Sequence, residues 1–196
     1  MSYFYVMGID PASIRNLGVA MLRFDTNTKR IEVVVHTTEI LPNVQTDGER
    51  LLYIYELMKK YHDEYKPKVL AVERSTGFGK SFVRQNLQES AGVMKMFCHQ
   101  KNIRVDEISP KHIKLIISGS GNASKKEVIQ AVMDYTGMEK SKTEHEADAV
   151  ASAIVFLIDE GMLPEIHPGT YKSRQSIQEA KDKAKARKKM KRGKAK

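Results

Sequence analysis

Acidic residues end two apolar runs of this sequence and gather again near its end. The runs 3–10 and 68–73 close on Asp10 and Glu73, and further acids open the alanine-rich segment that begins at residue 144. A carboxylate at the end of a buried strand is costly unless a partner compensates its charge. We therefore treat these acids as candidates for a shared cation, although each acid alone would fit a helix cap or a structural ion pair.

The chemistry that needs such a set is metal-assisted hydrolysis of a phosphodiester. Hard carboxylate oxygens suit Mg²⁺, which also accepts substrate phosphates as ligands. Two ions about 3.5–4 Å apart can activate a water molecule and stabilise the leaving oxygen. On a helix, His145 and Asp148 are three residues apart and Glu144 and Asp148 are four apart, so each pair shares a face.

The elements that would position these residues follow from the hydrophobic pattern. Residues 3–10, 17–25 and 30–40 have the character of consecutive strands, and short polar connections favour an antiparallel meander. Residues 46–65 have a helical period, with Thr46 or Asp47 as the N-cap. A helical crossover places the next strand, 68–73, parallel to the first. The acids that end both strands are then expected at one edge of the sheet.

The rest of the body reads as one short strand and four helices. The strand is 104–108, and the helices are expected at about 81–101, 110–117, 125–135 and 144–161. Gly92 lies inside the first of these helices and predicts the close approach of another helix. The alanines of 144–161 would let that helix lie close against the sheet.

Composition predicts one globular domain in a reducing compartment. The chain has 196 residues, of which 41% are hydrophobic and 29% charged. Its single cysteine, Cys98, excludes an internal disulfide and a cysteine-rich zinc site. We see neither a signal peptide nor an apolar run of membrane-spanning length. We therefore expect a cytoplasmic protein without a membrane partner.

The net charge of +9 is concentrated at the C-terminus. Residues 172–196 contain twelve of the 33 basic residues and two of the 24 acids, which leaves the preceding body with a net charge of −1. We expect one folded domain at 1–165 and a basic, flexible tail at 166–196. Such a tail attracts polyanions and favours nucleic-acid binding, although a solubilising extension is the simpler alternative.

Four ordered motifs resemble those of the RuvC-type Holliday junction resolvases, over about residues 4–158. These motifs are Gly8-Ile9-Asp10-Pro11-Ala12-Ser13 with Gly18, Ala71-Val72-Glu73, the segment 119–128, and Ala147-Asp148-Ala149-Val150-Ala151 with Ala153. The resemblance implies an α/β, RNase H-like fold with a mixed five-stranded sheet flanked by helices. The basic tail, and the positions at which this chain differs from cellular members, resemble the phage-encoded branch of the family. That branch would act in the cytoplasm of a host cell.

The resemblance also implies an activity, a cofactor and a partner. Members are homodimers that bind a four-way DNA junction and nick two opposing strands symmetrically, with Mg²⁺ or Mn²⁺ and two ions per active site. By position, the metal-ligating residues fall on Asp10, Glu73, Asp148 and His145. Many members have Asp where this chain has His145, so Glu144 and Glu146 remain rivals for the fourth ligand.

The same alignment of motifs suggests DNA contacts. Lys125 would stabilise charge that develops at the scissile phosphate, whereas Lys114 fits a solvated helix position equally well. The glycine-rich loop 76–80 holds Phe78 and Lys80, and Phe82 follows it. Thr76 replaces an aromatic residue that enters the junction in cellular members. Phe78 or Phe82 would replace it by stacking on a base, unless either belongs to the core.

The leading hypothesis is thus a metal-dependent, structure-selective endonuclease that leaves 5′-phosphate and 3′-hydroxyl ends. A nuclease with broader activity on branched DNA, an RNase H-like nuclease acting on RNA or on simple duplex DNA, and a non-catalytic branched-DNA-binding protein of the same fold are the alternatives.

Overall fold

The computed structural model describes residues 2–11, 15–43, 46–74, 81–139, 141 and 143–169. Within these ranges the elements in chain order are β1 (Tyr3–Asp10), β2 (Asn16–Asp25), β3 (Arg30–Ile40), α1 (Asp47–Tyr65), β4 (Val69–Glu73), α2 (Ser81–Gln100), β5 (Arg104–Ile108), α3 (Pro110–Ser118), α4 (Lys125–Thr136) and α5 (Glu144–Asp159). Their bounds lie within two residues of those expected from the sequence.

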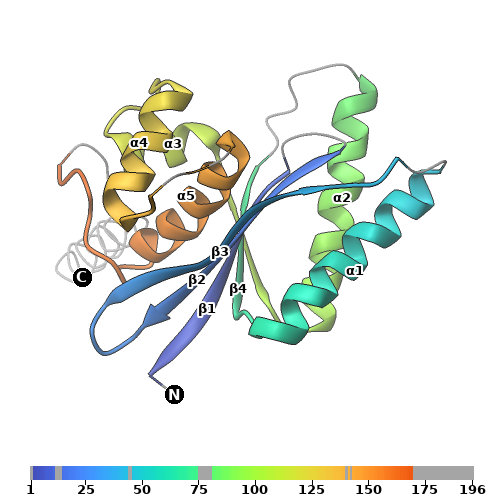
Figure 1. Ribbon diagram of the computed structural model, residues 1–196, viewed down its shortest axis with the longest axis horizontal. Coiled ribbons are helices and arrows are strands. Elements are labelled where there is room, and N and C mark those ends of the chain that lie inside the picture. The colour runs from blue at the N-terminus through green and yellow to red at the C-terminus, as the bar shows by residue number, and fades with distance from the viewer. Residues whose placement is uncertain are drawn as a thin grey trace, which may run out of the picture.

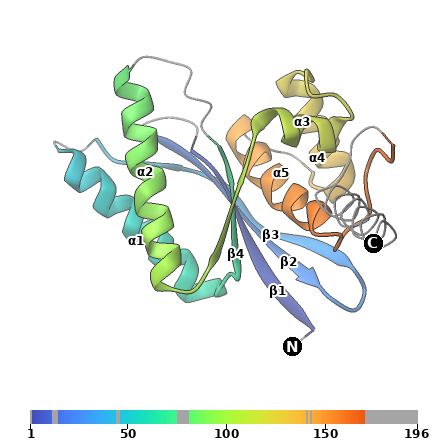
Figure 2. The ribbon, with the colours of Figure 1, turned by 180° about the vertical axis from the view of Figure 1, so that it is seen from behind.

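The strands form one mixed sheet in the order β3-β2-β1-β4-β5. β1, β2 and β3 make the predicted antiparallel meander, whereas β4 is parallel to β1 and β5 is parallel to β4. α1 and α2 cover one face of the sheet, and α3, α4 and α5 cover the other (Figure 1; Figure 2 shows the same layers from behind). No helix in the described ranges is long and apolar enough to cross a membrane.

Each face of the sheet buries its own apolar cluster. Along β1, Val6 packs in the cluster beneath α3, α4 and α5, whereas Met7 and Ile9 pack in the cluster beneath α1 and α2. A strand buried on both faces reads as a continuous apolar run rather than as an alternation. This explains why the first strand was recognisable from its sequence and why Asp10, at its end, is a conspicuous exception.

α1, α4 and α5 begin at side chains suited to capping. Thr46 rather than Asp47 is the N-cap of α1 and forms a capping box with Glu49. Ser124 does the same for α4. Thr143 caps α5, where its hydroxyl accepts a hydrogen bond from the backbone N–H of Glu146. The N-terminus of α5, which carries the predicted site residues, is therefore fixed by its local sequence.

Two glycines let α5 lie directly on the sheet. A Cβ on Gly8 of β1 would lie 2.0 Å from the carbonyl oxygen of Ala149, and a Cβ on Gly18 of β2 would lie 2.0 Å from that of His145. Real side chains do not approach a backbone this closely, so any larger residue at either position would displace the helix. The predicted close packing of the alanine-rich helix is confirmed.

The prediction for Gly92 is wrong for the described part of the chain. Gly92 lies on an exposed side of α2, and a Cβ at this position would meet no described atom within 4 Å. Met96, one turn further along the helix, is 51% exposed. A glycine within a helix therefore did not mark a helix contact here.

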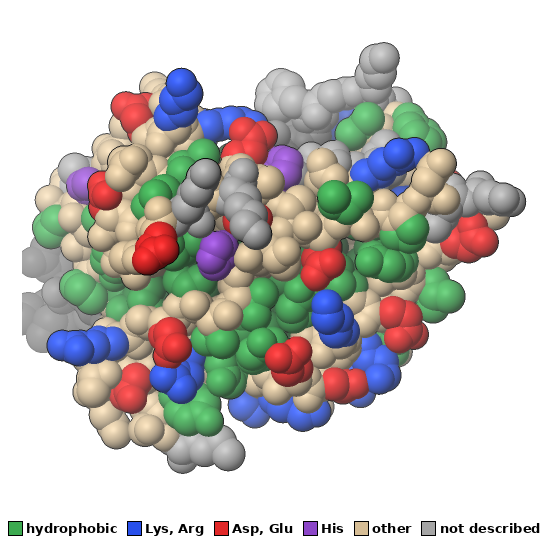
Figure 3. Space-filling model, in the orientation of Figure 1, with side chains coloured by type: hydrophobic (Ala, Val, Ile, Leu, Met, Phe, Trp, Pro, Cys, Tyr) green, Lys and Arg blue, Asp and Glu red, His purple; other side chains and the backbone are tan. Residues whose placement is uncertain are grey.

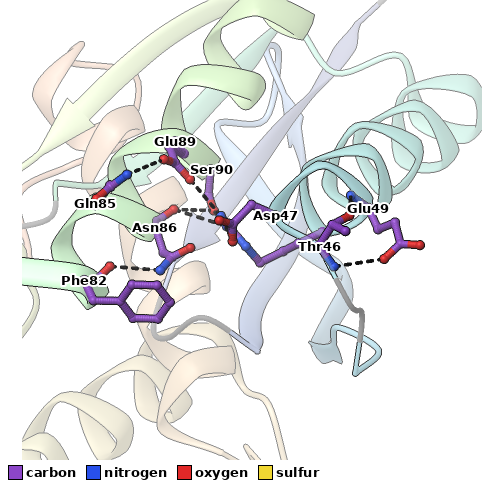
Figure 4. A network of polar contacts seen from close by, with 9 residues as sticks. Thr46, Asp47, Glu49, Phe82, Gln85, Asn86, Glu89 and Ser90 are labelled. Atoms are coloured by element: carbon purple, nitrogen blue, oxygen red, sulfur yellow. Dashed lines mark hydrogen bonds and ion pairs between the residues drawn. The ribbon is translucent and has the colours of Figure 1, made fainter.

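α1 and α2 are joined by a buried polar network around Arg50, which is only 4% exposed (Figure 4). Its guanidinium donates to the side chains of Ser90 at 2.8 Å and Glu89 at 2.9 Å, and to the carbonyl of Asn86 at 3.3 Å. The Asn86 amide in turn donates to the carbonyl of Phe82. This network fixes the N-terminal half of α2 against α1.

Replacing Arg50 with Met is expected to lower the free energy of unfolding by about 2–3 kcal/mol, because Glu89 and Ser90 lose a buried donor. Urea denaturation followed by circular dichroism measures this loss. Lys59→Met is the matched control, since it breaks an exposed pair with Asp63 on α1 and should cost less than about 0.5 kcal/mol. Equal losses in the free energy of unfolding would show that the Arg50 network stabilises the fold no more than an exposed ion pair does.

Candidate active site

Asp10 and Glu73 lie side by side at one edge of the sheet. The parallel register pairs Ile9 with Val72, so the acids that follow these residues end neighbouring strands in the same direction. Asp10 is 6% exposed, although it is a carboxylic acid. The strands act as rigid supports, because their backbone hydrogen bonds fix where each carboxyl group emerges.

α5 brings a third acid and a histidine to the same place. Gly18 lies against the backbone of His145, and Asp148 follows one turn later on the same face. The imidazole Nδ1 of His145 lies 3.0 Å from Oδ2 of Asp10, within hydrogen-bonding distance. Segments more than 130 residues apart in the sequence thus meet at this edge.

These side chains open into one cavity of about 360 Å³. Its charged and titratable lining residues are Asp10, Glu73, Lys114, Lys125, Glu144, His145 and Asp148. α3 contributes Lys114 and α4 begins with Lys125, so four different elements besides β1 supply the cavity. The cavity combines a floor of carboxylates with lysines, as a site that binds both cations and phosphate requires.

Burial and mutual repulsion hold these acids toward their protonated forms. Burial, followed by the nearby charge of Asp148, raises the pKa of Asp10 to about 7. Burial, followed by the charges of Asp10 and Asp148, raises the pKa of Glu73 to about 8. Burial also raises the pKa of Asp148, and Lys125 opposes this increase. A cation in the cavity would relieve the repulsion that these pKa values reflect.

The three residues that compete for the role of fourth metal ligand lie in different surroundings. His145 contacts Asp10 directly, as described above. Glu144 lines the cavity, but its carboxylate accepts a hydrogen bond of 2.5 Å from Nζ of Lys125. Glu146 is buried elsewhere, within hydrogen-bonding distance of His36 on β3. The sequence pattern had not revealed the Lys125–Glu144 pair, whose partners lie on different helices.

The donor set suits Mg²⁺. Among the described residues, no three histidine, cysteine or acidic side chains are gathered so that they could hold one ion together. Mg²⁺ does not require such a trio, because it keeps several waters and takes one or two carboxylates together with substrate phosphates. One buried carboxylate, that of Asp10, and two half-buried ones, those of Glu73 and Asp148, line the cavity and are ligands of this kind.

The predicted aromatic contacts are only partly visible. Thr76, Phe78 and Lys80 lie outside the described residues. Phe82 is the second residue of α2 and is 62% exposed, so it is not a core residue. It does not line the cavity described above. Its role in DNA binding stays a prediction.

The surface of the body carries both signs of charge. Figure 3 shows acidic and basic side chains interspersed over one face, without a broad basic area. This agrees with the net charge near zero of the body.

The predicted tail begins at residue 166. Ile166 packs against the core and His167 Nε2 lies 3.1 Å from the carbonyl oxygen of Ile117, whereas residues from 170 onward lie outside the described ranges.

The fold and the site together define an RNase H-like nuclease. The mixed sheet has five strands in this order, acids end its parallel strands β1 and β4, and a third acid lies on the helix packed across them. The model of the family "Crossover junction endodeoxyribonuclease RuvC" matches residues 6–156. The chain therefore belongs to the RuvC family. A RuvC of Prochlorococcus marinus strain MED4 is 35% identical over 157 residues, which cover 80% of this chain and 98% of the relative.

Other comparisons agree with this assignment. A RuvC of Treponema denticola is 30% identical over 150 residues, covering 76% of this chain and 83% of that relative. Thermus thermophilus RuvC in complex with a Holliday junction substrate superposes with a TM-score of 0.72 at 22% identity, over 81% of this chain and 97% of the other. The fowlpox virus Holliday junction resolvase gives 0.55 at 14% identity, over 82% and 100%. These structural likenesses confirm the predicted fold.

Proposed function

We propose that this chain is a metal-dependent endonuclease that resolves four-way DNA junctions by paired, symmetric nicks. The observation that carries the proposal is the convergence of Asp10, Glu73 and Asp148, from β1, β4 and α5, on one cavity that Lys114 and Lys125 also line. A protein that only binds DNA gains nothing from placing one buried and two half-buried carboxylates where a phosphate must lie.

Asp10, Glu73, Asp148 and His145 are the proposed metal ligands. The RuvC family depends on a divalent metal ion, and we propose Mg²⁺, with Mn²⁺ as a substitute and two ions in each site. When bound, Mg²⁺ supplies Lewis acidity toward a phosphoryl oxygen and lowers the pKa of water. The residues of the chain contribute position: two acids on rigid strand ends and one on a helix whose start is capped.

The other side chains act on the substrate. Lys125 donates to Glu144, which holds its ammonium group at the cavity. A scissile phosphate entering there would compete with Glu144 for this donor and gain compensation for charge that develops on its oxygens. Lys114 lies across the same cavity, on α3, and adds a second positive charge. His145 is placed either to bind the cation or to accept a proton.

Paired nicks require two active sites in one assembly. A homodimer with twofold symmetry places two identical sites on a substrate that is itself nearly symmetric. We therefore propose that the working unit is a homodimer on branched DNA in the cytoplasm. The phage-encoded origin, and the division into a domain at 1–165 and a DNA-attracting tail, stay predictions.

The test uses a labelled four-way junction, Mg²⁺ and an excess of unlabelled linear duplex. We expect cutting at symmetric positions on opposing strands, products that DNA ligase seals without further treatment, and little inhibition by the duplex. Sealing by ligase shows that the ends are 5′-phosphate and 3′-hydroxyl. Each strand is labelled in turn so that unpaired nicks are recognised.

Other results would select the alternatives. Equal cutting of flaps, forks and junctions would indicate a broader branched-DNA nuclease. Junction binding without cleavage in Mg²⁺ or Mn²⁺ would indicate a binding protein, and efficient competition by linear duplex would contradict junction selectivity.

A further inference from the structure

The edge strand β3 contains a β-bulge. Its register with β2 passes from Leu22–Val33 directly to Met21–Val35, so Val34 is the extra residue. Because side chains alternate between the two faces of a sheet, one extra residue reverses which face every later side chain occupies. The side chains that follow Val34 therefore lie on the opposite faces of the sheet from those they would occupy in a regular strand.

The burial pattern shows the result of this reversal. Before the bulge, Ile31 and Val33 pack with the cluster beneath α3, α4 and α5, whereas Val35 after it packs with the cluster beneath α1 and α2. His36 and Thr38 consequently face α5. Without the bulge, the alternation of β3 would direct these two polar side chains toward α1.

Both side chains reach the first turn of α5. Nδ1 of His36 lies 3.2 Å from Oε2 of Glu146, which is 3% exposed, and Oγ1 of Thr38 lies 2.5 Å from Oγ1 of Thr143. The Thr143 hydroxyl also accepts from the backbone N–H of Glu146. Hydrogen bonds thus link the edge strand to the cap of the helix.

We propose that the bulge at Val34, together with His36 and Thr38, forms a positioning clamp that holds the metal-binding end of α5 against the sheet. This inference rests on the proposed function, because the clamped turn carries His145 and leads into Asp148. Gly18, which pairs with Thr38, sets how closely the turn approaches the sheet, and the clamp sets its rotation and its position along the sheet. His36 and Thr38 do not line the cavity of the active site, so they are positioning residues rather than catalytic ones.

The test compares a His36→Leu/Thr38→Val double variant with Arg104→Met. Arg104 of β5 makes a two-pronged ion pair with Glu160, at the other end of α5, and its loss removes a comparable tie on the same helix. For each protein we would measure the thermal midpoint against Mg²⁺ concentration, without DNA, and then the Mg²⁺ dependence of junction cleavage. Thr38→Val and Thr38→Ser are made singly in case the double variant does not fold.

We expect the double variant to need about tenfold more Mg²⁺ for half of its stabilisation and for half-maximal cleavage, as is usual when a supporting contact of a metal site is lost. Arg104→Met should lower the thermal midpoint and change the Mg²⁺ requirement less than twofold. Thr38→Ser, which keeps the hydroxyl, should behave like the wild type, and Thr38→Val should not.

The proposal would be overturned if the double variant, or the Thr38→Val variant, had a lowered thermal midpoint but the Mg²⁺ requirement of the wild type. The contacts of His36 and Thr38 would then stabilise the fold without positioning the metal site. A wild-type protein that neither responds to Mg²⁺ nor cleaves would instead overturn the proposed function.

Discussion

Replacing Asp10 with Asn is expected to reduce junction cleavage at least about 10³-fold while making the metal-free protein more stable at pH 8. Loss of a supporting partner of a metal site costs about 10–100-fold, and loss of a ligand should exceed this. The gain in stability follows from burial, because Asp10 is 6% exposed and has Asp148 nearby. Asn removes the charge but keeps the shape of the side chain.

The direction of the pH dependence follows from the same residue. The pKa of Asp10 is about 7 in the folded chain and close to 3.8 when unfolded, so between these values the folded state binds more protons. Stability therefore falls as pH rises from about 4 toward 7, and Glu73 extends the fall to about pH 8. For Asp10 alone the cost at pH 8 is on the order of 2–4 kcal/mol. Mg²⁺ should offset it increasingly as pH rises, because it binds the ionised acids.

Thermal unfolding of metal-free protein between pH 5 and pH 8, with and without Mg²⁺, measures this effect. The Asp10→Asn variant should lose less stability over this range than the wild type and respond less to Mg²⁺. Asp159→Asn is the control, since Asp159 is also buried and also lies beside a histidine, His112, but does not line the cavity of acids. Its replacement should destabilise the chain. An Asp10→Asn variant that cleaves at the wild-type rate would contradict the assignment of the site.

Replacing Gly18 with Ala is expected to reduce both stability and cleavage. The new Cβ would lie 2.0 Å from the carbonyl oxygen and 2.6 Å from the carbonyl carbon of His145. Backbone atoms cannot rotate away as a side chain does, so α5 must shift by an ångström or more. Overpacking of this kind costs about 1–3 kcal/mol, and a shift of about 1 Å in catalytic groups costs about 10²-fold in rate.

Gly92→Ala is the matched control for that substitution. Its Cβ would meet no described atom within 4 Å, and alanine favours a helix over glycine, so the variant should gain about 0.5–1 kcal/mol and cleave normally. Urea denaturation and junction cleavage are measured on both variants. Normal cleavage by the Gly18→Ala variant would show that activity does not depend on the close packing of α5 against β2.

The sequence by itself determined the order of the elements and most of their ends. Continuous apolar runs marked β1 and β4, because strands buried on both faces have no polar side to display. Local capping residues such as Ser124 and Thr143 fixed where helices begin. Asp10 and Glu73 stood out for the same local reason, since each is an acid that ends an apolar run. These features depend on near neighbours in the chain and can be read without the fold.

Only the tertiary structure decided what depends on distant partners. Gly8 and Gly18 lie against α5, whereas a Cβ on Gly92 would meet no described atom within 4 Å, and the hydrophobic pattern alone predicts neither outcome. Glu144 and Glu146 differ by two positions, yet one faces Lys125 across the cavity and the other is buried against His36. The bulge at Val34 is equally invisible in a β-branched run. Each of these outcomes is set by the pairing of surfaces that the chain brings together only when it folds.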